Sequence, residues 1–239
     1  MSEEHQRLVK QYEEIAILAG GLAHEIRNPL STIQMNLELL FEDLEEMAFS
    51  ENHRIVRKLR TIRQETSHLE EILDAFLQFA QAGELHLEKV DFGKMVRAFL
   101  EFYKPKAERA GIELLSHIPS DLPEIEIDQR LIKQVLDNLV RNAQQAMPDG
   151  GTLEIQACDA DDNVLIDIID TGCGMSPQAL EKMFDVFFST KASGSGLGLP
   201  TVKKIVEAHG GHLGCESEVG RGTKFTITLP IDNRRSKES

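Results

Sequence analysis

Residues 24–30 place a histidine, a carboxylate and an amide within one helical turn of one another. Apolar residues around them recur in steps of seven, four or three, which predicts one stripe of a long helix: Ile15, Leu22, Ile26, Ile33, Leu37, Leu40, Leu44 and Met47. His24 lies two residues from both Leu22 and Ile26, so its imidazole should face solvent as a potential nucleophile. Glu25 is the next residue, and Asn28 lies one turn on, over the same patch of surface.

A proline follows this group directly. Pro29 has no N–H for the carbonyl of Glu25, and its ring crowds that carbonyl, so we expect a kink beside His24. Strain of this kind favours a functional position. Two interpretations without a catalytic role stay open. His24 could be only solvated, as a lone surface histidine usually is. Asn28 could also merely ease the helix into Pro29, since a residue before proline avoids the helical region.

Two asparagines four residues apart could hold a metal ion. Asn138 and Asn142 should project from one face of a helix. Their side-chain carbonyls suit Mg²⁺, a hard cation that prefers oxygen and bridges phosphates. An ordinary polar helix face would look the same.

A carboxylate ends the most apolar stretch of the chain. Asp170 is followed by Gly172 and Gly174, and it could accept a hydrogen bond from the amino group of adenine, where guanine would present a carbonyl. The glycines would let the backbone turn tightly and approach a ligand. A plain Asp-Gly turn is the alternative.

A glycine-rich run could bind phosphates. Gly194, Gly196, Leu197 and Gly198 lead into a helix, where backbone N–H groups and the helix dipole favour an anion. Lys191 could add positive charge or be an ordinary solvated lysine. Flexible linkers can have the same composition. We derive no role for the further glycine turn at residues 220–223.

The first of these groups requires a helical hairpin. Residues 1–83 read as two long helices with a turn near Phe49–His53, the second carrying a heptad-like stripe from Ile55 to Ala80. One hairpin leaves much of each stripe exposed to water. Two hairpins form a four-helix bundle with a shared core, so we expect a homodimer.

The other groups require a mixed domain over residues 84–232, before a polar tail at 233–239. We expect helices at Phe92–Ala110, Leu131–Met147, Pro177–Phe184 and Pro200–His209. We expect strands at residues 85–90, Ile112–Ile118, Ile125–Ile127, Leu153–Ala157, Val164–Ile169 and Phe225–Leu229. The strand at Val164–Ile169 is almost wholly apolar and should be central in a sheet.

Composition excludes some classes of protein. The net charge of −14 argues against nucleic-acid binding, which needs a basic surface. No apolar run reaches the roughly 20 residues of a membrane helix, and no signal peptide is recognisable, so we expect a cytoplasmic protein. Three cysteines without metal-like spacing indicate free thiols. The seven other histidines, which include His86 and His209, should be structural or solvated.

Taken in order, these motifs resemble those of two-component sensor histidine kinases of the nitrogen-regulation type, over residues 8–230. The resemblance implies a dimeric phospho-acceptor domain and an α/β sandwich of the GHKL (Bergerat) ATPase type, the group of gyrase, the HSP90 chaperones and MutL. It implies His24 as phospho-acceptor, Glu25 as its base, Asn142 as magnesium ligand, Asn138 at the phosphates and Asp170 at adenine, with ATP and Mg²⁺ bound. A response-regulator receiver domain is the implied partner, and a separate sensor protein is a further candidate.

Some features depart from this pattern or allow another one. Relatives place a basic and an aromatic residue where this chain has Gln145 and Ala146, so Arg141 or Lys191 would have to supply the charge. A GHKL conformational clamp would need a water-activating carboxylate, for which the segment offers only Asp137. A nucleotide-sensing scaffold is a second alternative. Asn28 also implies phosphatase activity toward the regulator.

Overall fold

The computed structural model describes residues 27, 30–42, 53–81, 85–186, 188–191 and 196–232. The described residues form two compact units. One holds the described residues up to Gln81 together with Lys191, and the other holds residues 85–190 and 196–232. Across these ranges, no helix is long and apolar enough to cross a membrane.

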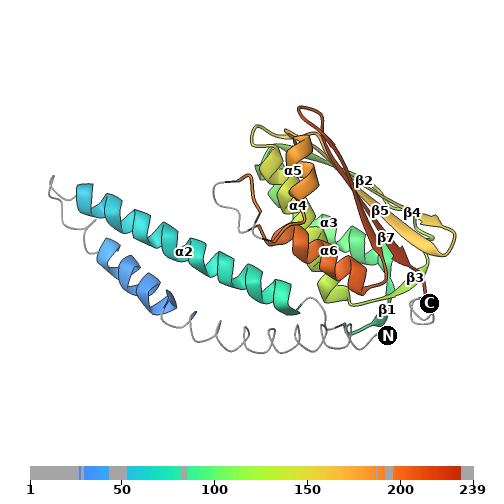
Figure 1. Ribbon diagram of the computed structural model, residues 1–239, viewed down its shortest axis with the longest axis horizontal. Helices are drawn as coiled ribbons and strands as arrows, with labels where there is room; N and C mark the ends of the chain where they lie inside the picture. The colour runs from blue at the N-terminus through green and yellow to red at the C-terminus, as the bar shows by residue number, and fades with distance from the viewer. Residues whose placement is uncertain are drawn as a thin grey trace. The chain divides into compact units, whose positions relative to one another are not determined.

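The first unit is a pair of helices, residues 30–42 and α2 (His53–Gln81), which lie side by side (Figure 1). Three cross-helix contacts step by seven residues in opposite directions along the two helices. They are an ion pair between Arg27 and Asp74, a contact between the side-chain amide of Gln34 and the hydroxyl of Ser67 at 3.4 Å, and the guanidinium of Arg60 over the ring of Phe41 at 5.2 Å. This register is that of an antiparallel heptad pair, which confirms the predicted hairpin. Of the predicted turn at Phe49–His53, residues 49–52 lie outside the described residues, and His53 begins α2.

The second unit contains all of the described strands (Figure 1). Its elements are, in order, β1 (Glu88–Asp91), α3 (Phe92–Arg109), β2 (Ile112–His117), β3 (Glu124–Ile127), α4 (Gln129–Ala146), β4 (Gly151–Ala160), β5 (Asn163–Asp170), α5 (Pro177–Lys182), α6 (Gly198–Ala208), β6 (His212–Glu218) and β7 (Gly222–Pro230). Asp91, Asp128 and Ser176 cap α3, α4 and α5, each accepting a backbone N–H of the first turn.

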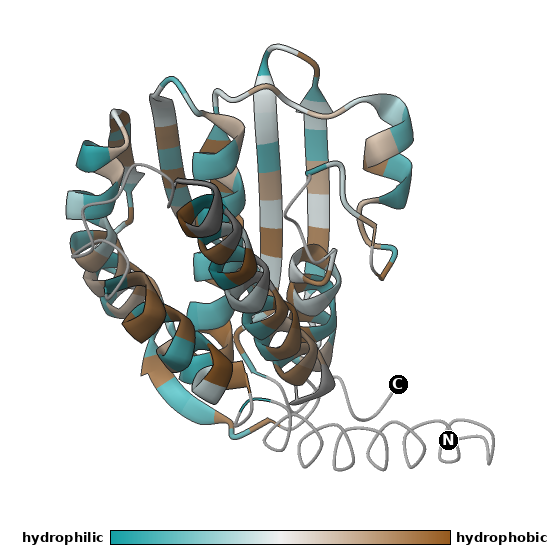
Figure 2. Ribbon diagram, turned by 90° about the vertical axis from the view of Figure 1, so that its left-hand side faces the viewer, coloured by the Kyte–Doolittle hydropathy of each residue, from teal (hydrophilic) through white to brown (hydrophobic). Residues whose placement is uncertain are grey.

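A five-stranded mixed sheet has the order β2-β4-β5-β7-β6, in which only β2 and β4 are parallel. The helices α3, α4 and α6 cover one face of this sheet (Figure 1). Residues alternate between buried and half-buried along β5 and β7, and Figure 2 shows the corresponding bands of apolar and polar residues on the strands. The unit is therefore a two-layer α/β sandwich, as predicted. β1 and β3 form a separate antiparallel pair.

Most predicted elements are confirmed, but one strand was missed and several boundaries differ; β4 and β7, for example, are both longer than predicted. β5 is the middle strand, as its apolar run indicated. The sequence interpretation missed β6, an edge strand in which only Leu213 is buried, so its apolar signal is weak. Leu85 and Leu87 precede β1 instead of forming it, and α5 ends at Lys182, two residues earlier than expected.

Candidate functional site

The predicted asparagine pair lies on one face of α4. Asn138 and Asn142 are both half-buried, whereas Asp137 and Arg141, one position earlier, are exposed. The side-chain nitrogen of Asn138 donates to the carbonyl of Gln134 at 3.1 Å. A Cβ placed on Gly198 would lie 3.3 Å from the amide oxygen of Asn138. The first residue of α6 and the asparagine face of α4 are therefore adjacent.

The acidic end of β5 lies against the last turn of α4. Asp170 is 6% exposed, and its Oδ1 accepts the N–H of Gly172 at 2.8 Å. The N–H of Cys173 donates to the carbonyl of Ala146 at 3.0 Å. A Cβ on Gly172 would lie only 2.7 Å from the Cβ of Ala146. The small side chain of Ala146 thus lets this loop pack on α4.

The glycine turn at residues 220–223, for which no role could be derived from the sequence, supports the same carboxylate. Thr223 pairs with Asp170 across β5 and β7. Gly222 has a φ of +109°, and a Cβ there would lie 1.9 Å from the carbonyl oxygen of Asp170. The hydroxyl of Ser217 lies 2.9 Å from that of Thr223 and accepts the N–H of Met175 at 2.9 Å. The turn therefore positions the Asp170 loop.

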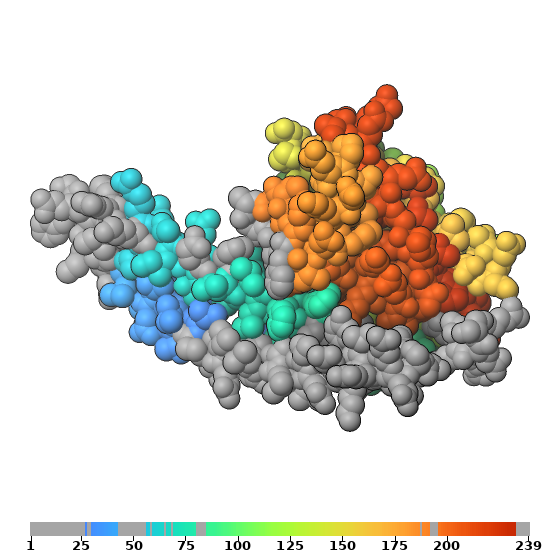
Figure 3. Space-filling model, viewed as in Figure 1, coloured from blue at the N-terminus to red at the C-terminus, as the bar shows by residue number. Residues whose placement is uncertain are grey.

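The described part of the glycine-rich run begins α6. Gly196 has a φ of +67°, which favours glycine. Leu197 is fully buried, and its carbonyl accepts both the N–H and the hydroxyl of Thr201, at 3.0 and 2.6 Å. Pro200 lies in the first turn, as expected. Leu197 therefore anchors the run in the protein interior. Figure 3 shows the segments that contain α5 and α6 at the surface of this unit.

The charge of Asp170 affects a neighbouring thiol. Burial, together with the negative charges of Asp170 and Glu216, raises the pKa of Cys215 to about 12. Cys215 therefore stays protonated and unreactive near neutral pH. All three cysteines are free, as predicted, and Cys158 and Cys173 are exposed.

The contacts described above do not include the other predicted residues. Arg141 forms an exposed ion pair with Asp137 at 3.8 Å. Lys191 is exposed and groups with the helical unit. The phospho-acceptor group His24, Glu25 and Asn28 lies outside the described residues, as does Gly194. Their roles stay predictions.

Together, α4, the Asp170 loop and the start of α6 form one polar, glycine-lined face. Amide oxygens from Asn138 and Asn142 suit a hard cation that also binds phosphate. A buried carboxylate at Asp170 suits an amino group, and the missing side chains of Gly172 and Gly198 let the Asp170 loop and α6 approach α4 closely. The donor set fits an adenine nucleotide with Mg²⁺.

Comparison with known proteins agrees with this chemistry. Residues 14–85 match the family model "His Kinase A (phospho-acceptor) domain". Residues 127–233 match the family model "Histidine kinase-, DNA gyrase B-, and HSP90-like ATPase". This structure is similar to a solved structure of the catalytic domain of histidine kinase ThkA. The match covers 99% of the ThkA chain at 30% sequence identity, with a TM-score of 0.56. The chain belongs to the histidine kinase family.

Further relatives in the histidine kinase family match nearly the whole chain. The signal transduction histidine-protein kinase AtoS of Escherichia coli (strain K12) is 33% identical over 96% of this chain and 38% of its own length. The full-length structure of ShkA in complex with AMPPNP has a TM-score of 0.71 at 31% identity, over 90% of this chain and 45% of that one. The chain spans about a third to a half of the length of the curated relatives it matches.

Proposed function

We propose that this chain is an ATP-dependent protein-histidine kinase that phosphorylates itself on His24 and passes the phosphoryl group to an aspartate of a response-regulator receiver domain. The observation that carries the proposal is that α4 contacts the start of α6 at Asn138 and the Asp170 loop at Ala146, within a unit that matches the histidine-kinase-like ATPase model. The match of residues 14–85 to a phospho-acceptor family model supports His24 as the acceptor. The ThkA structure in complex with the response regulator protein TrrA supports the partner; it is 25% identical, with a TM-score of 0.68, over 98% of this chain and 69% of that one.

The chemistry needs little more than positioning. Asp170 would hold the adenine amino group, and Asn138 and Asn142 would lie at the phosphates. Mg²⁺, held by Asn142, would neutralise charge on those phosphates. A neutral imidazole can attack through Nε2 near neutral pH. A bond forms from Nε2 of His24 to the γ-phosphorus, the bond from that phosphorus to the bridging oxygen breaks, ADP leaves, and Glu25 accepts the Nδ1 proton.

Labelled ATP with Mg²⁺ tests the proposal on the full chain. We expect an acid-labile, alkali-stable phosphoprotein. His24→Gln should abolish labelling and leave nucleotide binding unchanged, and Asn142→Asp should reduce labelling and metal-dependent binding together. His212→Gln is the matched control, since His212 is exposed on β6, and it should label normally. Labelling that persists in His24→Gln would overturn the assignment.

We also propose a homodimer through the helical unit. Large apolar side chains of the predicted stripes remain exposed in the single chain on both helices, among them Ile33, Leu40, Ile62 and Leu69, at 47–52% exposure. A second copy would bury these stripes in a four-helix bundle. The phospho-acceptor family match supports this arrangement. A cytoplasmic location is part of the same proposal, as expected from the sequence.

Removal of phosphate from the partner regulator is a second proposed activity. The amide of Asn28, one turn from His24, could hold a water in line with a docked phospho-aspartate. The clamp alternative gains no support, because Asp137, the carboxylate it would use, is 53% exposed and paired with Arg141.

A further inference from the structure

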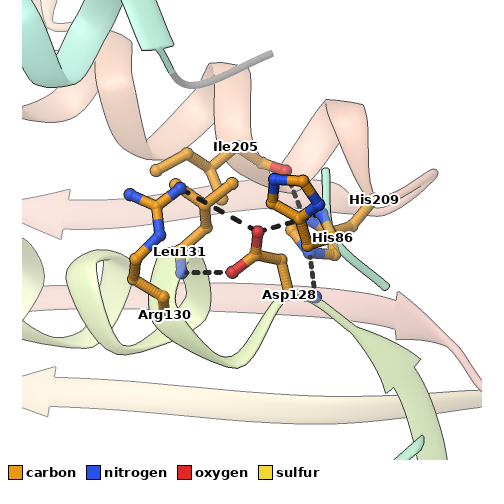
Figure 4. Close-up of polar contacts among 6 residues, drawn as sticks. All are labelled: His86, Asp128, Arg130, Leu131, Ile205 and His209. Carbon is orange, nitrogen blue, oxygen red and sulfur yellow. Dashed lines mark hydrogen bonds and ion pairs between the residues drawn. The ribbon is translucent and has the colours of Figure 1, made fainter. Parts of the chain in front are cut away.

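A buried polar cluster lies at the end of α4 opposite to the asparagines (Figure 4). Asp128 is 3% exposed and His209 is fully buried. Asp128 uses both carboxylate oxygens: Oδ1 accepts the N–H of Leu131 at 3.0 Å, and Oδ2 accepts the N–H of His86 at 3.1 Å. Its own N–H donates to Nε2 of His209 at 2.9 Å. Arg130 lies 4.0 Å from the same Oδ2. We call the pair the Asp128–His209 joint.

The hydrogen bonds determine the state of the imidazole. Because Nε2 of His209 accepts from Asp128, the ring proton must be on Nδ1, which lies 2.7 Å from the carbonyl of Ile205. A doubly protonated ring could not accept this N–H. Burial lowers the pKa of His209, against smaller raising effects of the Ile205 bond and of Asp128. The neutral Nδ1–H tautomer is therefore the one that fits.

The joint ties together three segments that are far apart in the sequence. Residues 85–87 lead from the helical unit into β1, α4 begins directly after Asp128, and α6 ends at His209. At 1.5 Å per residue, Asn142 lies about 21 Å from Asp128 along α4, and Gly198 about 17 Å from His209 along α6. The nucleotide face and the joint are thus at opposite ends of the same two helices.

We propose that the Asp128–His209 joint is a positioning device, which couples the anchoring of residues 85–87 to the separation of α4 and α6 at the nucleotide face. This inference rests on the proposed function only in taking that face as the nucleotide site. A close-packed interior transmits strain, so a change at one end of the packed pair α4 and α6 is felt in their spacing at the other end. By reciprocity, a nucleotide that requires one spacing must stabilise the joint as much as the joint favours the nucleotide.

The test uses the full chain, a non-hydrolysable ATP analogue with Mg²⁺, calorimetry for affinity, and hydrogen exchange read by mass spectrometry on a peptide that covers residues 85–91. The analogue should slow exchange of the His86 amide in the unmodified chain. His209→Leu leaves the buried N–H of Asp128 without its acceptor, so exchange should rise and affinity should fall about tenfold. His209→Gln should restore both, because its amide oxygen can take the place of Nε2.

A second variant separates the joint from helix capping. Asp128→Asn keeps a good N-cap for α4, yet an amide has an oxygen at only one of the two carboxylate positions, and the NH₂ group at the other cannot accept the N–H of Leu131 or His86. Amide exchange in residues 85–91 should rise, and the analogue should no longer slow it. The melting temperature of the protein should fall less than it does in His209→Leu. The ¹⁵N signals of His209 should report a protonated Nδ1.

Each outcome decides the proposal. Exchange of residues 85–91 that is unchanged by bound analogue in the unmodified chain would overturn the coupling, even if the variants fail to fold. Equal effects of His209→Leu and His209→Gln would reduce the joint to ordinary packing and so refute it. These readouts do not require phosphoryl transfer. A chain that binds analogue and protects residues 85–91 but never labels His24 would refute the kinase and keep the joint.

Discussion

Replacing Gly222 by alanine should move Asp170 and weaken nucleotide binding. Gly222 has a φ of +109°, and an added Cβ would lie 1.9 Å from the carbonyl oxygen of Asp170 and 2.8 Å from its carbonyl carbon. Both neighbours are backbone atoms at the end of the central strand, so neither can rotate away as a side chain would. The strand end must shift.

The chain contains its own control for this substitution. Gly220, in the same turn, has a φ of +78°, but nothing lies within 4 Å of an added Cβ. In both positions the strained conformation costs about 1–2 kcal/mol, offset by about 0.4–1 kcal/mol from the lower entropy of the unfolded chain. Crowding adds about 1–3 kcal/mol for Gly222→Ala alone. The difference between the two variants therefore isolates the contact with Asp170.

Thermal unfolding and calorimetry measure the two consequences. For a chain of this size, about 1 kcal/mol shifts the melting temperature by about 2–4 °C. Gly222→Ala should therefore melt about 2–12 °C below Gly220→Ala. Hydrogen bonds to charged groups contribute about 1.5–3 kcal/mol, so a displaced Asp170 should weaken binding of an ATP analogue about ten- to hundredfold. Gly220→Ala should bind within about twofold of the unmodified chain.

Equal melting temperatures for the two variants would refute the steric argument. A lower melting temperature for Gly222→Ala with unchanged affinity would instead refute the assignment of Asp170 to the nucleotide, because the loop would then have moved without effect on binding.

Thiol reagents at about pH 8 should modify the exposed Cys173 and spare Cys215, because burial raises the pKa of Cys215 to about 12. Bound ATP analogue should slow the reaction at Cys173. Peptide mass spectrometry measures both reactions, and rapid labelling of Cys215 would contradict its burial. The free energy of unfolding, measured in urea, should fall as the pH drops below about 6.5. Burial lowers the pKa of His209, so the unfolded chain takes up a proton on this imidazole before the folded chain does. His209→Gln should lose that part of the pH dependence, and a pH profile identical to that of the unmodified chain would contradict the role of His209. Ile62→Glu, at a side chain 47% exposed in the single chain, should dissociate the dimer in light scattering, since a buried unpaired charge costs several kcal/mol; an intact dimer would exclude this stripe from the interface. Asn28→Ala should slow dephosphorylation of the regulator about tenfold, a barrier change of about 1.4 kcal/mol, while labelling by ATP survives; a parallel loss of both would leave Asn28 only a shaping role.

Much of the local structure was predictable because it depends on neighbours in the chain. The heptad stripe predicted α2. The apolar run of β5 predicted a central strand. Helix and strand periodicities repeat within a few residues, so composition and spacing are enough to reveal them. The order of the motifs likewise identified the family.

The sequence could not predict which distant backbones meet. Gly222 lies against Asp170 only because β5 and β7 pair in a register that sets Asp170 opposite Thr223. His209 accepts the N–H of Asp128, 81 residues earlier, only because α4 and α6 pack side by side. β6 went unseen because an edge strand buries too little apolar surface to leave a clear pattern. Periodicity specifies which face of an element is apolar, but pairing partners and register follow from how all the faces are buried together, and that is decided by the tertiary structure.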